Sequence, residues 1–183
     1  MLVRGISLML AMAGSVVLSA QPKERDPSVF DSFPVPPASK NLLFYIQRNK
    51  NANTIVYEAR FDAQGQLAMK NPVDVNWIRH TEGGKREPIS LLETNLAYGV
   101  KHRSTDAGVA QMAFVASARH PFRVEVGANG QAEARMMING HYARLHHVEI
   151  QADESALWPK IQYVDIHGID LLTGLSIEER YIP

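Results

Sequence analysis

Histidine is the residue type in this chain best suited to acid–base or metal chemistry, because cysteine is absent. His146 and His147 are adjacent on an expected strand, where successive side chains point to opposite faces, so the two cannot hold one ion together. No His-x-His or His-Glu-x-x-His spacing occurs. We therefore expect no metal site and no cofactor. The 7 histidines are expected to be exposed or singly hydrogen-bonded: His80, His102, His120, His141, His146, His147 and His167.

A second candidate for chemistry is a pair of carboxylates near the C-terminal end. Two strands expected there form a hairpin in which Ile169 pairs with Leu175. In this register Asp165 and Glu179 are cross-strand neighbours, and His167 lies on the same face. Two carboxylates beside an imidazole could perform general acid–base catalysis, as in a hydrolase. The alternative is an exposed charged row at a sheet edge. No Gly-x-Ser-x-Gly nucleophile motif supports the catalytic reading.

The third candidate is an arginine row on a three-stranded meander. Asn129-Gly130 and Asn139-Gly140 are tight-turn signals between runs that alternate apolar and polar residues, and they predict antiparallel strands over residues 122–150.

The register of this meander decides which side chains share a face. A three-residue loop with Gly130 in the left-handed region places Val126 opposite Ala132, and a two-residue turn then pairs Ile138 with His141. One face is apolar: Phe122, Val124, Val126, Ala132, Ala134, Met136, Ala143 and Leu145. The other face carries two rows: Arg123, Arg135 and Arg144, and beside them Glu125, Glu133 and His146.

The arginine row has two interpretations. Arg123, Arg135 and Arg144, with His146 beside them, could form a shallow site for a carboxylate or phosphate, which guanidinium forks bind bidentately. Alternatively the glutamates pair with the arginines on an ordinary solvated face.

Composition excludes some classes of protein. With 45% apolar and 21% charged residues, the 183-residue chain is globular. Its 19 Lys and Arg balance its 19 Asp and Glu, so we expect no nucleic-acid partner.

The N-terminus has the pattern of a signal peptide. One positive charge at Arg4 is followed by an apolar run over residues 5–20 that ends in small residues. We expect cleavage near Ala20 and an exported protein, periplasmic or extracellular, without a membrane span after cleavage. The absence of cysteine rules out a lipoprotein anchor and disulfides.

The remaining chain divides into a Pro-rich extended lead-in over residues 21–40 and one domain over residues 41–183. Ser90 and Glu93 form a capping-box pattern that predicts a short helix over residues 91–98, with Gly99 as its C-terminal cap. Strands are expected over residues 42–48, 54–62, 67–69, 73–80, 100–103, 111–118, within 122–150, and over 161–169 and 175–182.

The first two strands are expected to form a hairpin with a five-residue loop over residues 49–53. Pairing Arg48 with Thr54 places Phe44 and Ile46 on one face and Tyr57 on the other. Four aromatic residues could line a ligand pocket, or could simply be core: Tyr45, Tyr57, Phe61 and Trp77.

Short strands joined by tight turns, with one helix, predict a mainly β fold. We expect a single antiparallel β-barrel or sandwich-like domain of roughly eight to ten strands.

Several segments together resemble a known family. They read NLLFYIQR at 41–48, NTIVYE at 53–58, NPVDVNWI at 71–78, AYG at 97–99 and HGIDLLTG at 167–174, followed by Glu179-Arg180. In these segments the chain resembles the bacterial exported family called domain of unknown function 4833. The resemblance covers most of the expected mature chain. It implies an exported single domain and brings no assigned active residues.

Three functions compete on this basis. The leading hypothesis is a non-catalytic binding module of the cell envelope for a small or anionic ligand. The second is an envelope hydrolase that uses Asp165, His167 and Glu179. The third is a protein-interaction or assembly factor that uses a strand edge.

Overall fold

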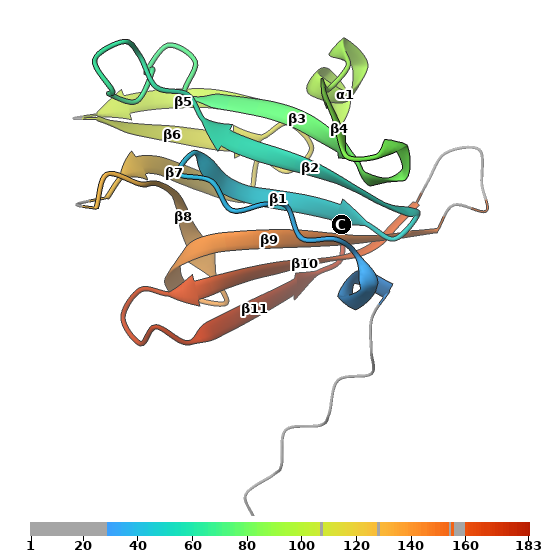
Figure 1. Ribbon diagram of the computed structural model, residues 1–183. Helices are drawn as coiled ribbons and strands as arrows, with labels where there is room; N and C mark the ends of the chain where they lie inside the picture. The colour runs from blue at the N-terminus through green and yellow to red at the C-terminus, as the bar shows by residue number, and fades with distance from the viewer. Residues whose placement is uncertain (1–28, 107, 128, 154, 156–159) are drawn as a thin grey trace, which may run out of the picture.

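The computed structural model describes residues 29–106, 108–127, 129–153, 155 and 160–183 (Figure 1). Its strands form one curled 11-stranded sheet, which confirms the predicted mainly β class. The elements are η1 (Val29–Ser32), β1 (Leu42–Arg48), β2 (Asn51–Ala59), β3 (Val73–Arg79), η2 (His80–Glu82), β4 (Lys85–Pro88), α1 (Leu91–Leu96), β5 (Val100–Asp106), β6 (Val109–Phe114), β7 (Pro121–Val126), β8 (Ala132–Ile138), β9 (His141–Asp153), β10 (Lys160–Asp170) and β11 (Ser176–Tyr181).

The sheet branches at β9. One edge of β9 pairs first with β8, up to Arg135 opposite Arg144, and then in parallel with β1, from Tyr45 opposite His147 onward. Its other edge pairs with β10, which pairs with β11. The result is two wings, β1–β4 and β5–β8, joined by β9, with β10 and β11 extending from the other edge of β9 (Figure 1).

The wings face each other across the core. The ring of Phe44 on β1 meets Phe114 of β6 and Phe122 of β7, with centroids 5.7 and 5.5 Å apart. Phe44 also stacks on Tyr57 of the neighbouring β2 at 4.3 Å. Offset and edge-to-face aromatic contacts of this kind stabilise a core beyond the area they bury.

A β-bulge at His146 lets β9 serve both wings. Leu145 pairs with Gly168 and His147 pairs with His167, so His146 is an extra residue on β9. Before the bulge Leu145 faces the core, and after it Val148 does. One inserted residue therefore reverses the alternation of faces along the strand.

The first hairpin is tighter than predicted. Phe44 pairs with Tyr57 and Gln47 with Thr54, so the predicted pairing of Arg48 with Thr54 is wrong, and Phe44 and Tyr57 share the core face. The expected five-residue loop is largely part of β2, because its polar side chains find partners there. Asn53 Oδ1, for example, accepts hydrogen bonds from the Thr81 backbone N–H and hydroxyl.

The meander follows the predicted register. Val126 pairs with Ala132, Ile138 pairs with His141, and Gly130 has a left-handed φ of 76°. The second turn places Asn139 at φ 48°, a conformation that Asn adopts more readily than most residues.

Helix α1 begins at the predicted capping box. The Ser90 hydroxyl accepts from the Glu93 N–H, and the Glu93 carboxylate accepts from the Ser90 N–H. The helix ends at Leu96, two residues earlier than predicted, and its C-cap is Ala97. Gly99 has another role, because a Cβ there would lie 1.8 Å from the Thr94 carbonyl oxygen.

The described part of the lead-in packs on the sheet. Phe30 is buried, and the Gln47 side-chain amide donates to the Pro34 carbonyl oxygen at 3.0 Å. The expected signal peptide lies outside the described residues. None of the helices in the described part of the chain combines the length and apolar character needed to cross a bilayer.

Candidate functional site

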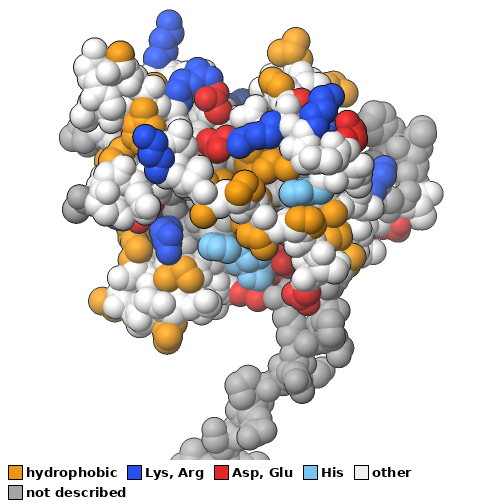
Figure 2. Space-filling view, viewed as in Figure 1, with side chains coloured by type: hydrophobic (Ala, Val, Ile, Leu, Met, Phe, Trp, Pro, Cys, Tyr) orange, Lys and Arg blue, Asp and Glu red, His pale blue; other side chains and the backbone are white. Residues whose placement is uncertain are grey.

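Histidines gather on the outer face of β9 and β10, away from the core. The bulge turns His146 and His147 to the same side, with their Nδ1 atoms 2.8 Å apart in a hydrogen bond. The expectation that these two side chains point to opposite faces is therefore wrong. The regular alternation on which it rests is interrupted at this position. Figure 2 shows histidine side chains over β9 and β10 with acidic side chains beside them.

His147, Glu149 and His167 form what we call the His–Glu cluster. The rings of His147 and His167 stack in parallel, with centroids 4.2 Å apart. Both direct Nε2 toward the Glu149 carboxylate, at 3.4 Å from His147 and 3.6 Å from His167. Tyr45 of β1 stacks on His147, 5.2 Å away. Glu149 is 5% exposed, so β1, β9 and β10 together enclose a carboxylate between two imidazoles.

The cluster keeps its carboxylate ionised. Burial raises the pKa of Glu149, but the polar and electrostatic effects of the adjacent His147 and His167 imidazoles outweigh burial and hold that pKa well below its usual range. Burial, with the charge of Glu149 nearby, raises the pKa of Tyr45. Partial burial and the charges of His147, Arg144 and His167 lower the pKa of His146.

The predicted catalytic trio does not assemble. Ile169 pairs with Ser176 rather than Leu175, so Asp165 faces Arg180 and His167 faces Glu178. The carboxylate of Glu179 accepts from the Asn139 N–H instead.

The shift of one residue arises in the turn before β11. The Asp170 carboxylate accepts from the backbone N–H groups of Leu172 and Thr173, and Gly174 takes a left-handed φ of 72°. This turn is one residue longer than the sequence pattern indicates, and a shift of one residue exchanges the two faces of a strand.

Asp165 is bound by Arg180. Its carboxylate is fully buried and accepts two hydrogen bonds of 2.6 Å from Nε and Nη2 of Arg180. The hydrogen bond to Asp165 is the main cause that raises the pKa of Arg180, and Tyr163 lies 3.9 Å from that guanidinium. Both carboxylate oxygens of Asp165 are therefore occupied by Arg180.

The arginine row exists as predicted, since Arg123 pairs with Arg135 and Arg135 with Arg144. The central Arg135, however, forms ion pairs with Glu125 and Glu133. This is the ion-pair alternative for Arg135, and anion binding by the row stays a prediction.

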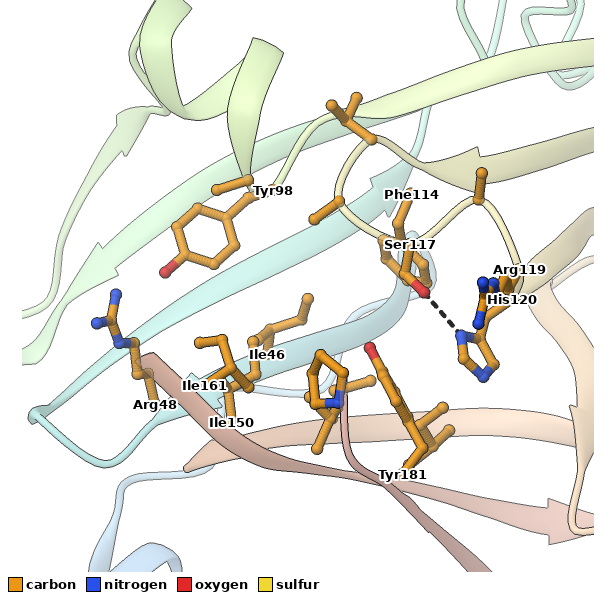
Figure 3. A pocket seen from close by; sticks show the side chains of 18 of the residues that line it. Ile46, Arg48, Tyr98, Phe114, Ser117, Arg119, His120, Ile150, Ile161 and Tyr181 are labelled. Atoms are coloured by element: carbon orange, nitrogen blue, oxygen red, sulfur yellow. Dashed lines mark hydrogen bonds between the residues drawn. The ribbon is translucent and has the colours of Figure 1, made fainter. Parts of the chain in front are cut away.

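A cavity of about 960 Å³ lies on the other side of β9 and β10, between the wings (Figure 3). Its wall is mainly apolar and comes from residues far apart in sequence, including Ile46, Phe114, Met136, Val148, Ile161 and Ile166. The four aromatic residues that we considered as pocket lining do not belong to its described wall, and Tyr57 is instead fully buried core.

The polar groups of the cavity lie at its two ends. Arg48 stands at one end, and Ser117, Arg119 and His120 stand at the other (Figure 3). The Ser117 hydroxyl is 2.7 Å from His120 Nδ1, and the His120 ring stacks on Tyr181 at 4.5 Å. The sequence offers no signal for this grouping, because it depends on how the two wings curl together.

Comparison with known proteins identifies a family. No curated protein and no solved structure matches the chain. A family model does match, over residues 44–180, which span β1 to β11 and include both the His–Glu cluster and most of the cavity wall. The chain therefore belongs to the family described as Domain of unknown function (DUF4833).

Proposed function

We propose that this protein is a non-catalytic binding module, which takes a small, elongated apolar molecule with an anionic group into the cavity between its wings. The observation that carries the proposal is the cavity itself. Its volume of about 960 Å³ lies near the upper end of the roughly 300–1,000 Å³ of small-molecule sites.

The chemistry of the wall supports this class of ligand. Apolar side chains from β1, β6, β8, β9 and β10 would bury a hydrocarbon chain, and each Å² of apolar surface removed from water contributes roughly 25 cal/mol. Arg48 and Arg119 provide positive charge at opposite ends, where a carboxylate or phosphate would bind.

The hydrolase hypothesis has less support. Asp165 is held by Arg180, and Glu179 contacts a turn rather than His167. In the cavity, Ser117 and His120 are hydrogen-bonded, but through Nδ1 and within one turn, where His120 N–H also donates to the Ser117 carbonyl. This is the geometry of a local turn contact.

The site of action belongs to the same proposal. The apolar run over residues 5–20, which follows Arg4 and ends in small residues, favours export to the cell envelope. N-terminal sequencing of protein from the envelope fraction should return Gln21 or a neighbouring residue. Recovery of Met1 would contradict export.

Binding is tested with dodecanoate as the probe and dodecanol as its uncharged counterpart. Isothermal titration calorimetry should show a saturable dodecanoate site. Ile161→Trp fills the cavity from β10 and should weaken binding at least about tenfold. Leu172→Trp adds the same ring at a turn residue that is 94% exposed, and should leave binding unchanged. Arg48→Gln should reduce the preference for dodecanoate over dodecanol.

Two results together would overturn the proposal. One is the absence of dodecanoate and dodecanol binding to the wild type. The other is native mass spectrometry of protein from its own envelope that shows no retained small molecule.

A further inference from the structure

We propose that His147, Glu149 and His167 bind a divalent cation of the Zn²⁺ type on the outer face of the sheet. The site is separate from the cavity, because Val148 and Ile166, their neighbours on β9 and β10, point to the opposite face and line the cavity wall. The ligands would be the two imidazole Nε2 atoms and one carboxylate oxygen, a set typical of zinc.

The donor atoms are close to the spacing that an ion requires. Zinc binds imidazole nitrogen and carboxylate oxygen at roughly 2.0–2.2 Å, so tetrahedral ligand atoms lie about 3.3 Å apart. His147 Nε2 lies 3.4 Å from Oε1 of Glu149, His167 Nε2 lies 3.6 Å from Oε2, and one donor atom from each residue lies within 4.8 Å of the other two. Whichever carboxylate oxygen binds the ion, one edge is therefore already close to the required length, and the other two need to shorten to about 3.3 Å from at most 4.8 Å.

Each outer ring nitrogen has a polar neighbour that could accept its proton. His167 Nδ1 faces the Glu178 carboxylate at 3.7 Å, and His147 Nδ1 is hydrogen-bonded to His146 Nδ1. A metal-binding histidine usually gives its other N–H to a carboxylate or similar acceptor, which leaves the lone pair of the first nitrogen for the ion. Glu178 and His146 are therefore positioning residues in this site.

His167 Nε2 supplies an independent observation. This nitrogen is buried and has no hydrogen-bond partner among the described residues, since its 3.6 Å separation from Glu149 exceeds hydrogen-bond length. With its proton on Nδ1, it would present a lone pair to a carboxylate, and two acceptors facing each other repel. A cation between them removes that repulsion and compensates for the burial of both groups.

Metal binding requires one local movement. The two rings are parallel within 3°, so their in-plane lone pairs run side by side, and one ring must turn about its Cβ–Cγ bond for both to converge. The side chains of His147 and His167 are 18% and 14% exposed, so the cluster lies close to the protein surface, with its buried His167 Nε2 just beneath. Three protein ligands leave a fourth position to water.

The neighbouring group of Asp165, His167 and Glu178 is a weaker candidate, although its donors are also within 4.8 Å. Asp165 already binds the Arg180 guanidinium through both oxygens, and a second cation beside that positive charge would be repelled. Nitrogen donors also favour zinc over Mg²⁺ or Ca²⁺, which prefer oxygen ligands.

The test uses untagged protein at pH 7.5 with Zn²⁺ alone. Native mass spectrometry and calorimetry should show one tightly bound Zn²⁺ per chain that excess Mg²⁺ does not displace. Bound Co²⁺ should give the intense visible absorption of a four-coordinate site with nitrogen ligands. Dodecanoate binding in the cavity should be unaffected, so this proposal and the proposed function can fail separately.

Variants separate ligands from positioning residues. Glu178→Gln should weaken Zn²⁺ binding roughly 10- to 100-fold, the usual effect of losing an outer partner. Glu149→Gln and His167→Gln should each weaken it more than Glu178→Gln does. The matched control is His102→Gln, which removes an exposed histidine on β5 and should have no effect.

The site is overturned if wild type binds no stoichiometric Zn²⁺, or if binding survives in both Glu149→Gln and His167→Gln. An equal loss of Zn²⁺ binding in His102→Gln would also overturn it. Circular dichroism of the metal-free variants shows whether each one folds. The site is supported only if at least one of Glu149→Gln and His167→Gln folds and loses the metal, and it is overturned if neither does.

Discussion

Gly168 offers the sharpest test of the packing at the bulge, because it lies beside His167 and pairs with Leu145. A Cβ built on Gly168 would lie 2.5 Å from Ile138 Cδ1 and 2.8 Å from the Arg144 carbonyl oxygen. Real Cβ atoms do not approach other atoms so closely. Gly168→Ala must therefore move both the side chain and the backbone beneath it.

The loss of stability in Gly168→Ala depends on how far the neighbouring atoms can move. Ile138 is fully buried, and the Arg144 carbonyl lies where β8 and β9 pair. Overpacking a well-packed core costs about 1–3 kcal/mol. The gain of roughly 0.4–1 kcal/mol from a less flexible unfolded chain is smaller, so Gly168→Ala should be destabilising by about 1–2 kcal/mol.

A double variant separates the two contacts. Ile138→Val removes the Cδ1 atom at a cost of about 0.5–1.5 kcal/mol by itself. In Gly168→Ala with Ile138→Val, the combined loss should be smaller than the sum of the single losses, because one of the two clashes is gone. The backbone clash with Arg144 remains, so the coupling should be partial.

The assay is urea unfolding followed by tryptophan fluorescence, with Gly127→Ala as the control. There the new Cβ would meet the tip of the Asn129 side chain at 3.1 Å, which can rotate away, so the stability should be almost unchanged. A Gly168→Ala variant as stable as Gly127→Ala would refute the close packing of β10 against β8 and β9.

Two further predictions concern the helix and the His–Glu cluster. Ser90→Ala removes the hydroxyl that caps α1 and should lower the free energy of unfolding by about 1 kcal/mol, measured as a shift in the urea midpoint; an unchanged midpoint would contradict the cap's contribution. The folded state lowers the pKa of Glu149, so the unfolded state binds more protons near pH 4, and stability should fall as the pH decreases from roughly 5 to 3. Glu149→Gln should flatten this dependence in unfolding free energies measured across that range, and identical slopes for both proteins would refute the assignment.

Local signals predicted the local structure well. The Asn-Gly turns, the register of the meander and the capping box depend on interactions between residues close in sequence, and the structure has all three. The arginine row followed from that register alone.

Predictions failed where one residue changes the alternation of faces. The turn before β11 is one residue longer than its pattern suggests, which replaces Glu179 by Glu178 beside His167. Asn51 to Asn53 read as loop residues because Asn is uncommon in strands, but the Asn53 side chain is paired with Thr81. The sequence of the turn before β11 does not show that Glu178 lies beside His167, and the sequence around Asn53 does not show that Thr81 is its partner.

The cavity and the histidine cluster have a common origin in the bulge on β9. A strand with regular alternation could keep Leu145 or Val148 in the core, but not both, because they are three residues apart. Pairing with β8 in the meander requires Leu145 in the core, and the parallel pairing with β1 requires Val148 in the core. The extra residue satisfies both wings, which allows them to enclose a cavity. The same insertion places His146 and His147 on one outer face, so the arrangement that closes the core on one side puts a positioning residue beside one of the candidate metal ligands on the other.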